Sequence, residues 1–141
     1  KFGNETFDRI ICSDVLEHIV EDEKVVMELT RVLKKNGRII FTFPSINEHN
    51  KGTMEDFGHV RPGYTLSSFK KLADKNGLKI TKFGGYTYFF GKIAWRINDK
   101  SLKIPPIAAL LFYPVYSLTY LDLLRIGKPN GLFFVTSKIN N

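Results

Sequence analysis

The sequence predicts an α/β protein of the doubly wound, Rossmann-like class, and two observations predict it. Short apolar segments alternate with segments of helical periodicity, at 7–12, 22–35, 38–43, 65–76 and 78–84. Strands that alternate with helices form parallel sheets through right-handed crossovers. A last apolar, β-rich segment at 132–138 adds one more strand.

The first helix and strand have clear sequence patterns. Segment 7–12 contains two adjacent isoleucines, which suits a strand buried on both faces. Segment 22–35 has acidic residues in its first turn and basic residues in its last, which complements the helix dipole. Gly37 is expected to be the left-handed residue that ends this helix. The apolar face of the helix is expected to consist of Val25, Val26, Leu29, Val32 and Leu33.

The next elements follow in the same way. Pro44 closes the buried strand at 38–43, and the polar segment 45–63 is predicted to be a long functional loop. Thr65 is expected to cap a helix that ends at 76–77 and buries Leu66, Phe69, Leu72 and Ala73. Alternation of apolar and polar residues then predicts the strand at 78–84.

Composition limits the classes of protein. The 141 residues include 43% hydrophobic and 25% charged residues, which is typical of one globular domain. The single cysteine, Cys12, excludes an internal disulfide framework and indicates a buried, reduced thiol in a cytoplasmic protein. The net charge of +7 is spread along the chain, without a basic tract, so no nucleic-acid partner is predicted.

The segment 86–130 is predicted to be an apolar, helical insertion before the last strand. No charged residue lies between Ile104 and Leu121, a length that is marginal for a membrane span, and Pro114 is expected to break a helix there. Three alternatives remain: helices that cap a substrate pocket, peripheral membrane contact through 104–126, or a true span. The first two are compatible, and the protein would then be cytoplasmic or membrane-associated.

The motifs Phe7–Ile19, Arg31–Gly37 and Ile39–Pro44 together resemble the fourth and fifth strands of class I S-adenosylmethionine-dependent methyltransferases, in the small-molecule group. The resemblance implies that 132–138 inserts antiparallel between 38–43 and 78–84. It also implies that 1–141 is one partial domain, the C-terminal portion of the methyltransferase sheet. The N-terminal strands that bind the cofactor would lie upstream.

The resemblance implies transfer of a methyl group from the cofactor S-adenosylmethionine to a small-molecule acceptor. The apolar insertion favours a lipid-like, isoprenoid or aromatic acceptor. The family's glycine-rich loop would lie upstream, so we expect the isolated chain to bind the cofactor weakly and to be inactive. We also expect the strand at 7–12 to form an exposed apolar edge, which promotes self-association.

The resemblance places the cofactor beside the loop that follows the first strand, formed by Cys12, Ser13, Asp14 and Val15. The alternative is that Ser13 or Asp14 merely caps a short helical turn at 14–19.

Glu17 and His18 would point toward the place where the donor methyl and the acceptor meet. Glu17 is a predicted acceptor contact, and His18 is a candidate general base. Pocket lining or a structural role remain alternatives for His18.

A second group lies before the helix that starts after Thr65. His59 is an alternative base, Arg61 suits a carboxylate or phosphate of the acceptor, and Tyr64 could donate a hydrogen bond. The alternative is that these residues only order the loop. No metal site is predicted, because Glu17 and His18 are adjacent and no histidine pair shows i, i+4 spacing.

Two other classes of protein fit part of the pattern. A nucleotide-binding oxidoreductase also alternates strands and helices, and an antiparallel last strand would favour the methyltransferase. A non-catalytic membrane-surface module would use the apolar insertion and the basic surplus.

Overall fold

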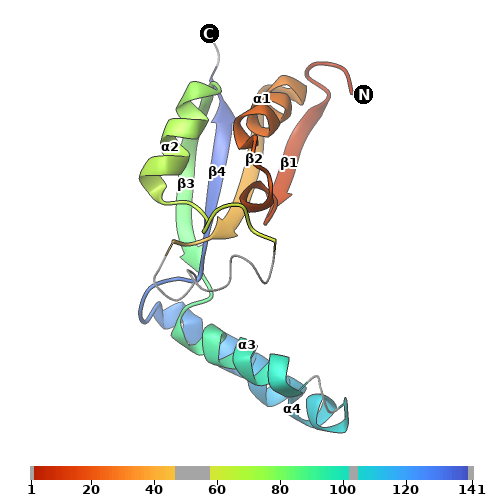
Figure 1. Ribbon diagram of the computed structural model, residues 1–141, viewed down its shortest axis with the longest axis vertical. Helices are drawn as coiled ribbons and strands as arrows, with labels where there is room; N and C mark the ends of the chain where they lie inside the picture. The colour runs from red at the N-terminus through yellow and green to blue at the C-terminus, as the bar shows by residue number, and fades with distance from the viewer. Residues whose placement is uncertain (1, 47–57, 102–104, 140–141) are drawn as a thin grey trace. The chain divides into compact units, whose positions relative to one another are not determined.

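The computed structural model describes residues 2–46, 58–101 and 105–139. The chain forms two compact units, one of Lys1–Gly84 with Gly131–Asn141 and one of Gly85–Asn130. The first unit contains the sheet, and the second contains the predicted insertion (Figure 1).

The sheet has four strands: β1 (Phe7–Ser13), β2 (Leu33–Pro44), β3 (Leu78–Tyr86) and β4 (Gly131–Lys138). Their order is β1-β2-β4-β3. β1 is parallel to β2, and β4 is antiparallel to β2. Figure 1 shows β3 running in the direction of β1 and β2. The prediction of a last strand inserted antiparallel between its two predecessors is therefore confirmed.

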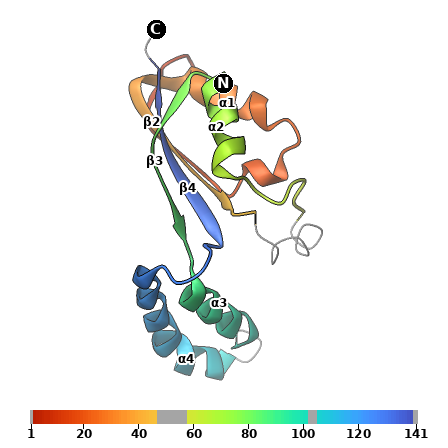
Figure 2. The same ribbon diagram turned by 90° about the vertical axis from the view of Figure 1, so that its left-hand side faces the viewer.

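One face of the sheet is covered by helices. α1 (Asp22–Val32) and α2 (Leu66–Lys75) lie on the same side of it (Figure 2). Side chains of β2 that point to this side, such as Phe41 and Phe43, are fully buried. Ile11 of β1 is 73% exposed, so the prediction that 7–12 is buried on both faces is wrong for this chain. The reason is that no helix among the described residues of this unit covers the other face.

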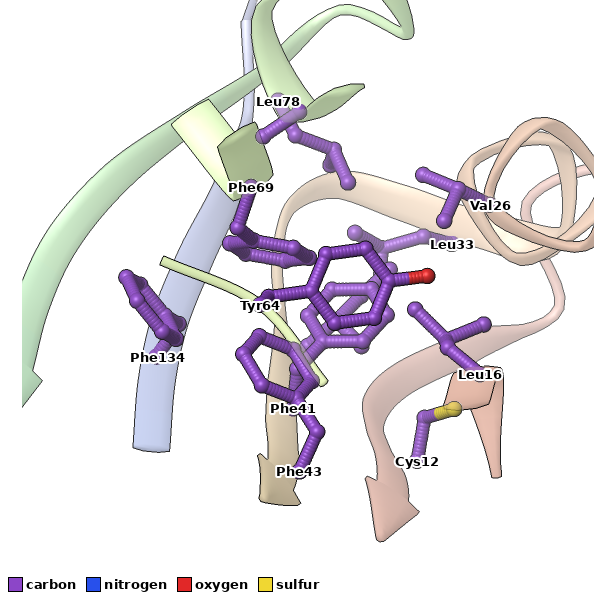
Figure 3. Close-up of a cluster of buried hydrophobic side chains, with 12 residues drawn as sticks. Cys12, Leu16, Val26, Leu33, Phe41, Phe43, Tyr64, Phe69, Leu78 and Phe134 are labelled. Atoms are coloured by element: carbon purple, nitrogen blue, oxygen red, sulfur yellow. The ribbon is translucent and has the colours of Figure 1, made fainter. Parts of the chain in front are cut away.

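Aromatic rings fill the space between the sheet and the helices (Figure 3). The ring of Phe43 lies 4.5 Å from that of Tyr64, 4.9 Å from Phe69 and 5.3 Å from Phe134, measured between centroids. Such tilted and offset pairs contribute beyond the burial of area alone. They hold the carboxyl end of β2 against the segment that enters α2.

The end of α1 differs from the prediction. The helix ends at Val32, and Leu33 already pairs with Phe7 of β1. Asn36, with φ 61°, takes the left-handed conformation expected of Gly37. Gly37 is needed for space instead, because a Cβ there would lie 2.7 Å from Cδ1 of Leu33.

The predicted limits of α2 are confirmed. The hydroxyl of Thr65 accepts a hydrogen bond from the Ser68 backbone N–H, and Ser68 in turn accepts one from the Thr65 backbone. Gly77 follows the helix with φ 70°. Of the expected apolar face, Phe69 and Ala73 are fully buried, whereas Leu66 is 40% exposed.

The second unit is helical, with α3 (Phe89–Ser101), α4 (Pro105–Leu118) and the 3₁₀ segment η3 (Thr119–Leu124). The expectation that Pro114 breaks a helix is wrong, because α4 continues through it. Pro105 and Pro106 begin this helix, where a proline loses no backbone hydrogen bond. Among the described residues, no helix has the length and apolar character needed to cross a membrane.

Candidate functional site

Polar side chains meet at the carboxyl ends of β1 and β2. The hydroxyl of Ser13 lies 2.7 Å from that of Thr42, and both donate to Oδ2 of Asp14 at 3.1 Å. Thr42 was not predicted, although its position at the end of the neighbouring strand would have indicated it. In open α/β sheets this edge is where ligands bind.

The backbone of the β1 loop fixes this group. The Asp14 N–H donates to the Thr42 carbonyl at 2.9 Å, and Asp14 has φ 50°. The following 3₁₀ turn, η1 (Leu16–His18), has Val15 at its N-cap and no side-chain cap. Because Val15 takes the N-cap position, the geometry gives no support to the alternative that Ser13 or Asp14 merely caps this turn.

Cys12 and Val15 differ in exposure. Cys12 is 7% exposed and packs in the apolar core (Figure 3), and burial raises the pKa of its thiol to about 11, with smaller contributions from Glu17 and Asp14. The prediction of a buried, reduced thiol is confirmed. Val15 is 39% exposed. In the described loop, cofactor contact by Cys12 would have to come from its backbone.

Glu17, His18 and His59 form a second group next to the first. One ligand-type atom from each of them lies within 4.8 Å of the others. The two imidazole centroids are 4.6 Å apart, with the rings at 75°. The two candidate bases are thus brought together, although they lie far apart in the sequence.

Backbone and ring hydrogen bonds produce this convergence. Nδ1 of His18 lies 3.2 Å from the Gly58 carbonyl oxygen, and the Val60 N–H donates to the Glu17 carbonyl at 2.8 Å. Both chain neighbours of His59 are therefore bound to η1. Adjacent residues on a 3₁₀ turn can thus join a third residue at one site, which removes the main reason for predicting no metal ligands here.

Burial perturbs the acid–base properties of this group. Glu17 is 1% exposed, and burial raises the pKa of its carboxyl group, with the charge of Asp14 adding to the effect. Burial lowers the pKa of His59, and the neighbouring His18 lowers it further. Both residues therefore favour their neutral forms more than they would in water.

Arg61 and Tyr64 have internal partners. The Arg61 guanidinium pairs with the Asp22 carboxylate and donates to the carbonyls of Ile19 and Val20, at 2.8 and 3.0 Å. The Tyr64 hydroxyl donates to Asp22 at 2.6 Å, and burial raises its pKa. This geometry favours the alternative that the two residues order the segment before α2.

The second unit has a pocket of its own. Its volume is about 790 Å³, and it is bounded by α3, α4, η3, the end of β3 and the residues that follow it. Most of its lining is apolar or aromatic, including Trp95, Phe112, Val115 and Tyr116. Asn98 and Asp122 add polar groups. Pockets of this kind and size suit small apolar ligands.

Comparison with known proteins supports a methyltransferase-like fold. Residues 1–41 match the family model described as a methyltransferase domain. The fold, with its antiparallel last strand, is that of the class I S-adenosylmethionine-dependent methyltransferases. The predicted resemblance is thereby confirmed, and the oxidoreductase alternative is disfavoured. No curated protein sequence matches the chain significantly.

Several solved structures share this fold. Phosphoethanolamine N-methyltransferase 2 of Haemonchus contortus, in complex with S-adenosyl-L-methionine, matches 99% of this chain with a TM-score of 0.65 and 19% identity. An S-adenosylmethionine-dependent methyltransferase of Mesorhizobium loti matches 96% of it with a TM-score of 0.58 and 12% identity. The chain spans 35% of the first protein and 64% of the second.

The same fold also serves another reaction. The [4+2]-cyclase SpnF matches 99% of the chain, with a TM-score of 0.59 and 14% identity. The fold alone therefore does not determine the reaction, which has to be argued from the site.

Proposed function

We propose that this chain carries part of an S-adenosylmethionine-dependent methyltransferase active site, with one group of residues for the cofactor and one for the acceptor. One observation carries the proposal. The Ser13–Asp14–Thr42 cluster lies at the carboxyl ends of β1 and β2, and the loop after β1 leads to a second group formed by Glu17, His18 and His59. An anionic cluster and a pair of imidazoles are thus available at the edge of the sheet where this fold class binds ligands.

The cofactor would meet the first group. The Asp14 carboxylate can attract the ammonium group of the cofactor's methionine part. The hydroxyls of Ser13 and Thr42 hold this carboxylate in place by donating hydrogen bonds to it. Cys12 and Val15 would contribute backbone groups, because the Cys12 side chain packs in the core. Matching structures that contain S-adenosylmethionine or S-adenosylhomocysteine support this choice of cofactor.

The acceptor would meet the second group. His18 is exposed, and its Nδ1 is hydrogen-bonded to the Gly58 carbonyl oxygen. Its Nε2 is therefore available to accept a proton from a hydroxyl or amine of the acceptor. His59 is the alternative base, and Glu17 lies beside both. Direct acceptor contact by Arg61 and Tyr64 gains no support from their internal hydrogen bonds.

Nitrogen-15 NMR of the chain during titration with S-adenosylmethionine tests cofactor binding, because it detects even millimolar affinity. We expect shifts in the amides of Ser13, Asp14 and Val15. Asp14→Asn should reduce them, because asparagine tolerates the left-handed backbone at this position but lacks the charge. Asp8→Asn is the matched control, since Asp8 lies at the opposite end of β1 and pairs with Lys34. Absence of shifts at these amides at millimolar cofactor would contradict the proposal.

The pocket of the second unit supports an apolar acceptor. Trp95, the single tryptophan, lines it, so intrinsic fluorescence reports on binding there. We expect an isoprenoid alcohol such as farnesol to change this fluorescence with saturation. Tyr116→Ala should weaken the effect, whereas Tyr113→Ala should not, because Tyr113 is 78% exposed and does not line the pocket. Equal affinity of both variants and the parent chain would remove the basis for an apolar acceptor.

Peripheral membrane contact is a second candidate function of the same unit. Large apolar side chains on α4 and η3 are well exposed: Leu110 77%, Phe112 56%, Leu123 82% and Leu124 63%. Large exposed apolar side chains that share one face mark membrane or protein contacts. Co-sedimentation with anionic vesicles should be lost in a Leu110→Ser, Leu123→Ser double variant, and retention of binding would oppose this candidate.

A further inference from the structure

The Glu17 carboxylate lies in an unusual environment. Glu17 is 1% exposed, yet its Oε2 atom has no hydrogen-bond partner among the residues that the structure describes. A buried carboxylate oxygen without a partner is costly, because it has lost its water and gained nothing in exchange. Such an atom needs either a proton or a cation.

Two imidazoles lie beside this oxygen. The ligand-type atoms of Glu17, His18 and His59 are all within 4.8 Å of one another. One carboxylate oxygen and two imidazole nitrogens form a donor set that suits first-row divalent metal ions.

The orientation of His18 is fixed in the way that metal ligands require. A carbonyl oxygen only accepts hydrogen bonds, so Nδ1, at 3.2 Å from the Gly58 oxygen, carries the proton. The lone pair is then on Nε2. A hydrogen bond from the second ring nitrogen to a carbonyl is the usual support of a metal-binding histidine.

The backbone also holds His59 in place. Its two chain neighbours bind η1, through the Gly58 carbonyl and the Val60 N–H. The position of the His59 donor is therefore fixed by hydrogen bonds of its two chain neighbours to η1. The site has one buried donor, one half-buried donor and one exposed donor, which leaves an open side for a further ligand.

We propose that Glu17, His18 and His59 bind a divalent transition-metal ion such as Zn²⁺. Tetrahedral zinc with bonds of about 2.0–2.2 Å needs donor atoms roughly 3.4 Å apart. The side chains would therefore move inward by about an ångström on binding, which the exposed His18 allows. The open coordination position would take an oxygen or nitrogen of the acceptor. This acceptor contact rests on the proposed function, whereas metal binding does not.

Calorimetric titration of the whole chain with ZnCl₂ tests the site, with Co²⁺ absorption as a second readout. We expect one ion per chain with micromolar affinity and visible bands typical of a tetrahedral cobalt site. Glu17→Gln and His59→Gln should each weaken binding at least tenfold. Glu21→Gln is the matched control, because Glu21 is an exposed carboxylate nearby that pairs with Lys24.

The outcomes separate this proposal from the methyltransferase proposal. Circular dichroism first confirms that each variant is folded. If Glu17→Gln does not fold, His59→Gln provides the test, because His59 is only half-buried. Zinc binding that is absent, or unchanged in the folded variants, would overturn the metal site. Zinc binding without cofactor-dependent shifts at Ser13 and Asp14 would keep the metal site and oppose the methyltransferase proposal. With an ion bound, the two imidazoles would serve as ligands rather than as bases.

Discussion

Arg61 and Asp22 form an ion pair that joins the segment before α2 to the start of α1. Both side chains are largely buried, with 21% and 22% of their surfaces exposed. The same carboxylate accepts the Tyr64 hydroxyl at 2.6 Å. Because the residues from Gly58 to Tyr64 carry His59, this pair helps to position the candidate site from a distance.

Removing the acceptor of this network should destabilise the chain. Asp22→Ala leaves the Arg61 guanidinium and the Tyr64 hydroxyl without their shared partner, and we expect a loss of about 1–3 kcal/mol in the free energy of unfolding. Urea denaturation measures it. Asp74→Ala is the control, because Asp74 forms an exposed pair with Lys70 and its removal should change stability by less than about 0.5 kcal/mol. Equal losses would show that the network contributes nothing specific.

Gly63 should tolerate no side chain. It has φ 111°, and a Cβ would lie 2.0 Å from the Pro44 carbonyl oxygen. Gly77→Ala is the matched control, since Gly77 also has positive φ but open space around it. We expect Gly77→Ala to cost about 1–2 kcal/mol from backbone strain alone, and Gly63→Ala to cost about 1–3 kcal/mol more from overlap. Similar thermal midpoints for the two variants would contradict the close approach seen here.

Cys12 should be unreactive in the folded chain. Burial raises the pKa of its thiol from 9.0 to about 11, so at pH 8 the thiolate fraction falls about a hundredfold. Ellman's reagent should therefore label the chain slowly until guanidinium unfolds it. Fast labelling of the native chain would mean that the thiol is accessible.

The raised pKa of Cys12 also predicts a pH dependence of stability. Between pH 9 and about 11 the unfolded thiol loses its proton while the folded thiol keeps it, so stability falls as pH rises. The stability advantage of the parent chain over Cys12→Ala should therefore shrink from pH 8 to pH 10. Urea denaturation of both chains at the two pH values measures this, and a constant difference would count against it.

Asp122 should stabilise the start of α3. Its carboxylate accepts the backbone N–H groups of Tyr88 and Gly91, at 2.8 and 2.9 Å, and so serves as a helix cap from a remote position. Asp122→Ala should cost about 1 kcal/mol and speed hydrogen exchange at these two amides. Ser117→Ala on α4 is the control, because its hydroxyl donates to the local Pro114 carbonyl. Unchanged exchange at Tyr88 and Gly91 would exclude the capping role.

The edge strand β1 should promote self-association. It pairs only with β2 within the described sheet, and Ile11 on it is 73% exposed. Ile11→Lys should lower the association seen by light scattering at rising concentration. Val20→Lys is matched in exposure, also 73%, but lies outside the strands and should have little effect. Association that persists equally in both variants would locate the contact elsewhere.

The strand and helix order was predictable because it depends on local periodicity and capping. The limits of α2 followed from Thr65 and Gly77, whose roles are set by neighbouring residues. The end of α1 was not predictable, because pairing of Leu33 with Phe7 overrides the helical pattern that continues past Val32. A long-range contact decided that boundary.

The candidate site was predictable only in part. The residues after the first strand were identified, since ligands bind at strand ends, but the internal partners of Arg61 could not be read from its sequence neighbours. The convergence of Glu17 with His59 depends on one backbone hydrogen bond and one bond of the His18 ring, both between η1 and a distant segment. The sequence does not show which distant backbone groups η1 contacts, so the donor set became apparent only in the structure.

The two ends of the inserted unit lie close together, because the Asn130 N–H donates to the Thr87 carbonyl at 2.9 Å. The strands that it connects, β3 and β4, are neighbours in the sheet and would otherwise need only a short hairpin turn. The unit is thus a self-contained insertion between two neighbouring strands. Such an insertion can be lengthened, shortened or replaced during evolution without disturbing the strand pairing. The same changes can be made in the laboratory by grafting at residues 85 and 130.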